Sequence, residues 1–392
     1  MRVDAIKDKV AIIGMGCTKF GENWNMSADD MIVDAVDEAV KDAGIELKDI
    51  NAAWVSTLGT MCSGYILSTP LKLEHIPITR VENLCASGMD ALRNACFGIA
   101  SGMYDIALVA GVEKLKDSGF GGLPEFFFHP AYGQGYTAPG RWALFANRYF
   151  ETYGISPEDG KTALAKIAVK NHYNGTMSPK AHFQKEITLK QALNAPVIAS
   201  PLGLFDCCPT TDGAAAAIIC RADMASSFKD NFVNVKGFGL AVGPGLGKED
   251  IDYRYDCLPE TIIAGRQAYE AAGIKNPRDE ISLAQVHDCF TIAELSEYEA
   301  LGFCEPGQAV REVEEGTFTL EGKLPVNTDG GLKSFGHPIG ATGIRMCNEL
   351  YLQLSGMAGK RQIKNPRLGL AMAQGGHPGM LLPIVTILGS RD

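Results

Sequence analysis

An internal repeat is the sequence feature that most limits how this chain can fold. The segment "DAVDEAVKDAGIELKDINAAWV" (34–55) resembles "AGRQAYEAAGIKNPRDEISLAQV" (264–286). The aligned positions are Ala35, Ala39 and 43–45 in the first copy and Ala264, Ala268 and 272–274 in the second. Each copy has the pattern of an Ala-rich helix, a Gly stop and a strand. The repeat predicts two related α/β halves that share one cleft; a chance likeness between two Ala-rich helices is the alternative.

A different kind of sequence separates the two halves. The stretch "GFGGLPEFFFHPAYGQGYTAPGRW" is rich in Gly, Pro and aromatic residues, and helical patterns such as "KTALAKIAVKNHYNG" follow it. A segment this long is typical of a subdomain or lid, not a connector. We therefore predict an N-terminal half at 1–117, an inserted loop domain at 118–206, the N-terminal half continued at 207–250, and a C-terminal half at 251–392.

Composition narrows the classes of function. The net charge of −10 argues against nucleic-acid binding and against a polybasic membrane patch. The start "MRVDAIKDKVAIIGMG" has no long apolar run, so we expect neither a signal peptide nor a membrane span. Eleven cysteines lie scattered in apolar contexts without a C-x-x-C pair, which favours a reduced, cytoplasmic protein. The spacing of His287 and Cys289 alone is too sparse for zinc, so no metal is expected.

Cys85 occupies a position at which a cysteine can become reactive. It lies in "VENLCASGMDALRNACFGIASG" (81–102), after the β-favouring run "PITRVEN" and before a helical pattern. The apolar face of that pattern consists of Met89, Leu92, Cys96, Ile99 and Met103. Unpaired N–H groups and a positive dipole at a helix start lower the pKa of a thiol. A buried, unreactive small side chain is the alternative.

Two further stretches offer imidazoles. "VHDCFT" (286–291) ends a predicted strand, and strand ends in α/β sheets are where sites form. His287 and Cys289 are two residues apart, so both could face one cleft; a core histidine beside a buried thiol is the alternative. "GGLKSFGHPIGATG" (330–343) surrounds His337 with five glycines and a proline. That composition lets the backbone approach a ligand and holds one imidazole in place.

A Gly-rich turn, "AMAQGGHPGM", follows the last predicted strand. Gly375 and Gly376 could present backbone N–H groups to an oxyanion, and His377 is expected at the rim of the site. Together with Cys85, the HDCF stretch and His337, this turn fits nucleophilic acyl transfer with acid–base assistance.

The four blocks "NLCASGMDAL", "HDCF", "GHPIGATG" and the terminal Gly-rich turn make the resemblance to a known family specific. In order and rough spacing the chain resembles the thiolase superfamily over essentially its whole length. "HDCF" is similar to the sterol-carrier-type branch, and the length and blocks look most like archaeal acetoacetyl-CoA thiolases. The resemblance implies two similar βαβαβαββ halves stacked in five layers (α-β-α-β-α) with an inserted loop domain, and a homodimer or homotetramer.

The resemblance also implies roles for the candidate residues. His337 would take the proton of Cys85, and Cys85 would attack acetyl-CoA. Many thiolases carry a second cysteine in the last Gly-rich turn, where this chain has Ala373. The sterol-carrier-type branch implies Cys289 as the substitute, which would deprotonate a second acetyl-CoA. His287 and His337 would form one oxyanion site, and the backbone N–H groups of Cys85 and Gly375 the other.

The implied function is acetyl-CoA C-acetyltransferase, the condensation of two acetyl-CoA that begins the mevalonate route to isoprenoids. No permanently bound cofactor is expected; coenzyme A thioesters are substrates, and no residues are assigned to the nucleotide of coenzyme A. Implied partners are hydroxymethylglutaryl-CoA synthase and a small zinc-ribbon/OB-fold bridging protein. The insert "GGLPEFFFHPAYGQGY" (121–136) offers apolar surface that a partner or the pantetheine arm could cover. The alternatives are a degradative 3-ketoacyl-CoA thiolase of the sterol-carrier type and a non-catalytic scaffold that binds coenzyme A or lipid.

Overall fold

The computed structural model describes residues 5–60, 62–117, 137–245 and 253–391. The aromatic insert at 121–136, where we predicted a covered apolar surface, lies outside the described residues. Within the described ranges, none of the helices combines the length and apolarity needed to cross a bilayer.

The elements follow one another along the chain in two series with an inserted group between them. The first series is β1 (Val10–Cys17), α1 (Ala28–Ala43), β2 (Ala52–Ser56), α2 (Tyr65–Leu71), β3 (Ile78–Val81), α3 (Ser87–Ala100) and β4 (Ile106–Glu113), and it resumes with β7 (Gly213–Arg221). The inserted group is α4 (Ala138–Tyr153), α5 (Pro157–Gly175), α6 (Leu189–Leu193), β5 (Val197–Ala199) and β6 (Leu202–Gly203).

The second series begins with β8 (Val233–Leu240). It continues with α7 (Pro259–Ala272), α8 (Pro277–Glu280), β9 (Leu283–Gln285), α9 (Thr291–Ala300), α10 (Ala309–Glu314), α11 (Gly331–Ser334), α12 (Ile339–Leu354), β10 (Leu368–His377) and β11 (Met380–Ser390).

The order of strands confirms the predicted two-half architecture. The nine-stranded sheet runs β3-β2-β4-β7-β1-β8-β11-β10-β9. The two halves of the sheet meet at a short antiparallel pairing between β1 and β8. Counted outward from this pairing, β7, β4 and β2 of the first half have the same positions and directions as β11, β10 and β9 of the second. The place of β3 in the second half is taken by Val326, which forms only an isolated parallel bridge with Ala284. Because β8 matches β1, we propose that the second half begins at β8 and not at residue 251.

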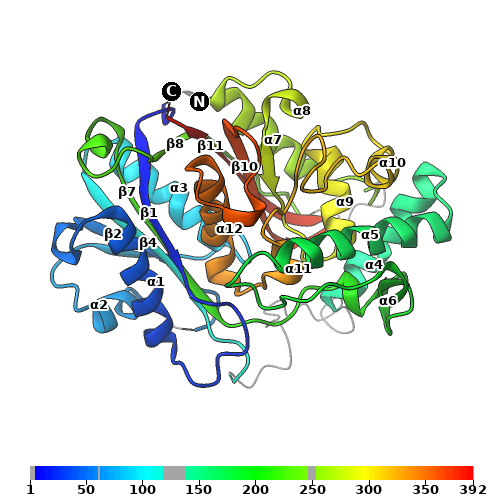
Figure 1. The fold of residues 1–392 in the computed structure, drawn as a ribbon, viewed down its shortest axis with the longest axis horizontal. Coiled ribbons are helices and arrows are strands. Elements are labelled where there is room, and N and C mark those ends of the chain that lie inside the picture. The colour runs from blue at the N-terminus through cyan, green and yellow to red at the C-terminus, as the bar shows by residue number, and fades with distance from the viewer. Residues whose placement is uncertain (1–4, 61, 118–136, 246–252, 392) are drawn as a thin grey trace.

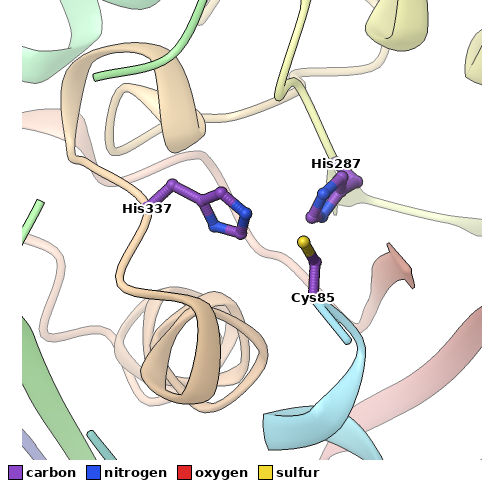
Figure 2. Close-up of side chains that lie close together, drawn as sticks. All are labelled: Cys85, His287 and His337. Atoms are coloured by element: carbon purple, nitrogen blue, oxygen red, sulfur yellow. The ribbon is translucent and has the colours of Figure 1, made fainter. Parts of the chain in front are cut away.

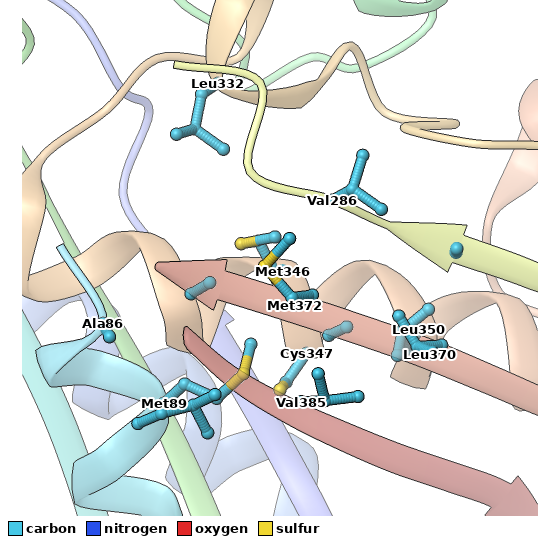
Figure 3. Packing of buried hydrophobic residues seen from close by; sticks show 14 of the residues in the cluster. Ala86, Met89, Val286, Leu332, Met346, Cys347, Leu350, Leu370, Met372 and Val385 are labelled. Carbon is cyan, nitrogen blue, oxygen red and sulfur yellow. The ribbon is translucent and has the colours of Figure 1, made fainter. Parts of the chain in front are cut away.

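Helices complete the five layers. In Figure 1, α12 lies between the strands of the first half and β10 and β11 of the second. It contacts α3 beside it, β4 and β7 on one side, and β9 and β10 on the other. On the outer faces, α1 covers β1 and β7, and α7 covers β8 and β11. Figure 3 shows the core around α12, in which Met346 and Cys347 belong to one cluster of buried side chains with Met89 of α3 and Met372 of β10.

The repeated alanines have a packing role that is the same in both halves. A Cβ added to Gly14 of β1 would lie 2.2 Å from the carbonyl oxygen of Ala39 in α1. A Cβ added to Gly239 of β8 would lie 1.8 Å from the carbonyl oxygen of Ala264 in α7. The contacts of Gly16 with Ala35 and of Gly237 with Ala268 repeat the arrangement. In each half the backbone of the outer helix therefore lies in direct contact with a strand, and this contact requires Ala in the helix and Gly in the strand.

The apolar face predicted after Cys85 is shorter than expected. Met89, Leu92, Cys96 and Ile99 are buried in α3, as predicted. Met103 lies beyond the end of the helix at Ala100 and is 71% exposed, so its assignment to that face was wrong. The chain turns at Gly102, whose φ of +77° ends the helical course.

The glycines around His337 let segments of the protein backbone approach one another, a role that the sequence interpretation did not include. A Cβ on Gly340 would lie 2.4 Å from the carbonyl oxygen of Ser56. A Cβ on Gly88 of α3 would lie 2.6 Å from the carbonyl oxygen of Gly340. The N–H of Gly340 donates to the carboxylate of Glu113 at 3.1 Å. The start of α12 is thus pressed against the first half by contact between backbones.

We expect Gly340→Ala to destabilise the protein by about 3 kcal/mol or more, because the new methyl group has no room among rigid backbone atoms. Gly59→Ala is the matched control, since a Cβ at Gly59 meets nothing within 4 Å; its free energy of unfolding should change by less than about 0.5 kcal/mol. Urea denaturation followed by circular dichroism measures both. Equal stability of the two variants would contradict this packing role.

Candidate active site

Cys85 lies at the tip of a sharp turn between β3 and α3. The preceding Leu84 has a φ of +52°, a left-handed conformation that is uncommon for a residue with a side chain. Ser87 braces the turn: its hydroxyl accepts from the N–H of Asn83 at 2.8 Å and donates to the carbonyl of Leu84 at 2.5 Å. A strained strand–turn–helix of this kind presents a nucleophile away from the backbone around it.

His337 is held in one tautomer. Its Nδ1 lies 2.7 Å from the hydroxyl oxygen of Thr342, and that hydroxyl donates to the carbonyl of Pro338 at 2.9 Å. Because a hydroxyl has a single proton, Thr342 accepts from the imidazole, and Nδ1 carries the hydrogen. Nε2 therefore keeps its lone pair, and it is buried without a hydrogen-bond partner in the described part of the chain. This is the tautomer that a general base needs.

The thiol and both imidazoles come together in one place. The sulfur of Cys85 and one ring nitrogen each of His287 and His337 all lie within 4.8 Å of one another. The two rings are edge-to-face, with centroids 5.1 Å apart and an interplanar angle of 86°. Figure 2 shows the thiol and both rings directed toward a shared space. The first half supplies the thiol and the second half supplies both imidazoles.

Cys289 is buried close to this group but is not one of its three members. Its carbonyl accepts from the N–H of Cys208 at 2.9 Å, and an antiparallel bridge between Cys207 and Phe290 sets Cys208 opposite Cys289. Burial raises the pKa of the Cys289 thiol well above its ordinary value, and negative charge on Cys208 or Cys85 would raise it further. The sequence interpretation missed Cys208; its place just before the strand β7 was the available signal.

The Gly-rich turn also reaches the nucleophile. A Cβ on Gly375 would lie 2.7 Å from the carbonyl oxygen of Asn83 and 3.4 Å from the backbone nitrogen of Cys85. His377, at the end of β10, is buried with its Nδ1 3.0 Å from the carbonyl of Pro378, and it is not a member of the Cys85 group. The oxyanion role of Gly375 and the rim role of His377 stay predictions.

Asp288 ties the two imidazole-bearing loops together. Its carboxylate accepts from the N–H of Leu332 at 2.6 Å and of Lys333 at 3.0 Å, and from the side chain of Asn171 at 2.8 Å. Burial and the nearby charge of Glu294 raise the pKa of Asp288 to about 7. The loop that carries His287 is thus bonded to the loop that leads to His337, so Asp288 fixes the position of one ring relative to the other.

The site is uncharged at rest. Burial, with a contribution from the negative charge of Glu113, raises the pKa of the Cys85 thiol to about 12. Burial, with a contribution from Arg345, lowers the pKa of His337 to about 3, and the pKa of His287 lies well below its ordinary value for the same reasons. The lowering of the thiol pKa expected from the helix start is therefore outweighed by burial. A neutral thiol faces two neutral imidazoles.

One thiol and two imidazoles are also a ligand set that zinc accepts. Cys85, His287 and His337 are the residues that could hold such an ion in the described part of the chain. The same three groups serve equally as a nucleophile with two imidazole partners, and that the protein uses no metal stays a prediction.

We expect alkylation of Cys85 by iodoacetamide in the free protein to accelerate about tenfold per pH unit from neutral pH upward, because the reactive thiolate forms only as pH approaches the raised pKa. Peptide mass spectrometry at a series of pH values measures the rate at Cys85 alone, and Cys85→Ala identifies the labelled peptide. A rate that levels off below pH 9 would show a thiolate already formed and would contradict the neutral resting site.

The chain is similar to proteins of one family over most of its length. Residues 10–223 match the family "Thiolase, N-terminal domain" and residues 248–389 match "Thiolase C-terminal domain-like". An acetyl-CoA acetyltransferase of Methanothermobacter thermautotrophicus is 40% identical, over 94% of this chain and 97% of that protein. An acetyl-CoA acetyltransferase of Methanocaldococcus jannaschii is 39% identical over 88% and 89%. Sterol carrier protein 2 of Gallus gallus is 34% identical over 92% of this chain and 69% of that protein.

Two solved structures share the fold. The "Ltp2-ChsH2(DUF35) aldolase" superposes with a TM-score of 0.85 at 26% identity and covers 98% of both chains. A monomeric SCP2-thiolase-like protein from Mycobacterium smegmatis superposes with a TM-score of 0.75 at 17% identity, over 97% of this chain and 77% of the other. The family matches, the relatives and the fold agree: the chain belongs to the thiolase superfamily and is an acyltransferase similar to archaeal acetyl-CoA acetyltransferases.

Proposed function

We propose that this thiolase joins two molecules of acetyl-CoA into acetoacetyl-CoA through an acetyl group carried on Cys85, as the first step of the mevalonate route. The observation that carries the proposal is the thiol of Cys85 beside the unprotonated Nε2 of His337. The identity to archaeal acetyl-CoA acetyltransferases supports the choice of acetyl-CoA as substrate.

In the first step, the sulfur of Cys85 attacks the thioester carbonyl while its proton passes to Nε2 of His337. A neutral thiol and a weakly basic imidazole do not exchange a proton readily before attack, so the transfer accompanies formation of the S–C bond. When the bond to coenzyme A breaks, the departing thiolate takes that proton back from His337. The acetyl group remains on Cys85, and His337 is again neutral.

In the second step, Cys289 first gives up its own proton to solvent, against its raised pKa, and the resulting thiolate removes a methyl proton from a second acetyl-CoA. The enolate carbon then attacks the acetyl group, forming a C–C bond and releasing the Cys85 thiolate, which takes the proton from Cys289. We propose that His287 and His337 hold the enolate oxygen, since both rings border the same space (Figure 2). His337 can do so only while its Nε2 carries a proton, because its Nδ1 is bonded to Thr342. The backbone N–H groups of Cys85 and Gly375 would hold the oxygen of the acetyl group.

The reverse reaction, cleavage of a longer 3-ketoacyl-CoA, would use the same residues. The similarity to sterol carrier protein 2 keeps this degradative role as a second candidate. A panel of ketoacyl-CoA substrates of increasing chain length separates the two: preference for the shortest favours the biosynthetic role.

Condensation of two acetyl-CoA is uphill, so a biosynthetic enzyme needs its product removed. We therefore propose association with hydroxymethylglutaryl-CoA synthase through a small zinc-ribbon/OB-fold protein, with this chain as a cytoplasmic homodimer or homotetramer. The name of the similar aldolase structure, "Ltp2-ChsH2(DUF35)", gives that protein a DUF35 companion chain, which supports a small companion here.

We expect acetyl-CoA to leave an acetyl group on Cys85, detectable by peptide mass spectrometry, and Cys85→Ala to abolish it. Cys289→Ala should keep the acetyl group but slow turnover by about 10²–10⁴. Cys208→Ala, which removes the neighbouring thiol, is the control and should retain most activity. Transfer of acetyl groups by Cys85→Ala would overturn the assignment, and loss of activity on dialysis against EDTA would point to a metal at the same residues. Absence of the acetyl group in the unmodified protein would favour the non-catalytic scaffold.

We expect the chain to co-elute with its proposed partners after co-expression of the three proteins and size-exclusion chromatography. The physical reason is that a shared complex passes acetoacetyl-CoA directly to the step that consumes it. Mixtures of the separately purified proteins serve as the control for coupled synthesis. Separate elution at micromolar concentration, together with coupled synthesis no faster than in that control, would contradict the association.

A further inference from the structure

Arg345 is a buried arginine with three of its five N–H groups left unused by the residues that the structure describes. It lies on α12, two turns beyond His337, and is 1% exposed. Its Nη1 donates to Asp329 at 2.7 Å and to Gln285 at 3.0 Å. Its Nε and Nη2 are buried and have no hydrogen-bond partner among the described residues. These two nitrogens form one edge of the guanidinium, with two parallel N–H groups spaced to bind a planar oxoanion.

This arginine lines a cavity of about 300 Å³ between α1, α12 and the loop that contains Ser178. Ser178 lines the same cavity, is 1% exposed, and its hydroxyl has no hydrogen-bond partner within the described ranges either. The cavity is bordered near the surface by Met357, which is 39% exposed, and by the ion pair of Lys180 with Glu38. The cavity therefore extends from near the surface to the side chains of Arg345 and Ser178.

The other charges around the cavity are offset by partners of their own. The carboxylate of Glu349 is bonded by Arg361, with contacts of 2.7–3.0 Å. Asp42 accepts from Lys229 at 2.7 Å and from the hydroxyl of Tyr351 at 2.7 Å. Asp329 offsets the charge of Arg345 through Nη1 alone. The free edge of the guanidinium is thus the feature of the cavity best suited to attract an anion.

We propose that this cavity is a binding site for one small oxoanion, held by Nε and Nη2 of Arg345 and by the hydroxyl of Ser178. Carboxylate, bicarbonate and phosphate share the required chemistry, which is two oxygens spaced to accept parallel N–H groups. The site is separate from the Cys85 group and does not rest on the function proposed above.

Isothermal titration calorimetry of the full-length protein with sodium acetate, bicarbonate and phosphate, at constant ionic strength, tests the site. We expect one anion to bind per chain, and the three titrations to identify which of the anions the cavity takes. Arg345→Lys keeps the charge but removes the paired N–H groups, and should weaken binding by about tenfold or more. Arg311→Lys is the matched control: Arg311 is exposed and paired with Glu315, and its replacement should leave binding unchanged.

Ser178→Ala keeps the test decisive if Arg345→Lys fails to fold, and circular dichroism identifies that case. It should weaken binding several-fold with an unchanged melting temperature in the absence of anion. Absence of saturable binding by the unmodified protein at millimolar concentrations of anion would overturn the proposal and would indicate that the cavity holds only water. Equal binding by the unmodified protein and by Ser178→Ala and Arg345→Lys would overturn it as well.

Discussion

The beginning of α12 is fixed by direct contact between backbones, and the arrangement of the site depends on that contact. Gly340 touches the strands of the first half where no side chain would fit, and its N–H is bonded to Glu113. The same carboxylate accepts from the N–H groups of Leu58, Gly59 and Thr60. His337 lies three residues before this anchor, so packing between backbones helps to place its ring near the Cys85 thiol.

The anchor has an electrostatic consequence for the nucleophile. Glu113 is a buried carboxylate that holds the two halves together, and its negative charge opposes ionisation of Cys85. Arg345 on the other side opposes protonation of both imidazoles. The two charges therefore favour the same neutral pair. Both charges thus act in the direction that keeps the imidazoles unprotonated and the thiol un-ionised near neutral pH.

Much of this arrangement is predictable from the sequence, and the parts that were missed share a physical cause. The repeated alanines predicted two halves because each outer helix needs a small residue at each contact with its strand. Cys85, His287 and His337 were found because a reactive residue type stands next to a strand end or a helix start. Asp288 and Arg345 were missed because their contacts are with segments far away in the chain. The sequence left open whether Cys85 is a reactive or a buried thiol, because a helix start is visible in a sequence whereas burial by distant segments is not.

The two halves of the sheet carry the Cys85 thiol and the His337 imidazole at matching positions. Cys85 precedes α3 in the first half, and His337 precedes α12, the matching helix of the second. Two identical copies of one half would offer two thiols or two imidazoles at this meeting point, and neither pair would set a sulfur nucleophile beside an imidazole. A thiol beside an imidazole therefore requires that the two halves differ in sequence at these two loops. The loops before α3 and α12 differ accordingly, while the glycines and alanines behind them keep the packing that the two halves share.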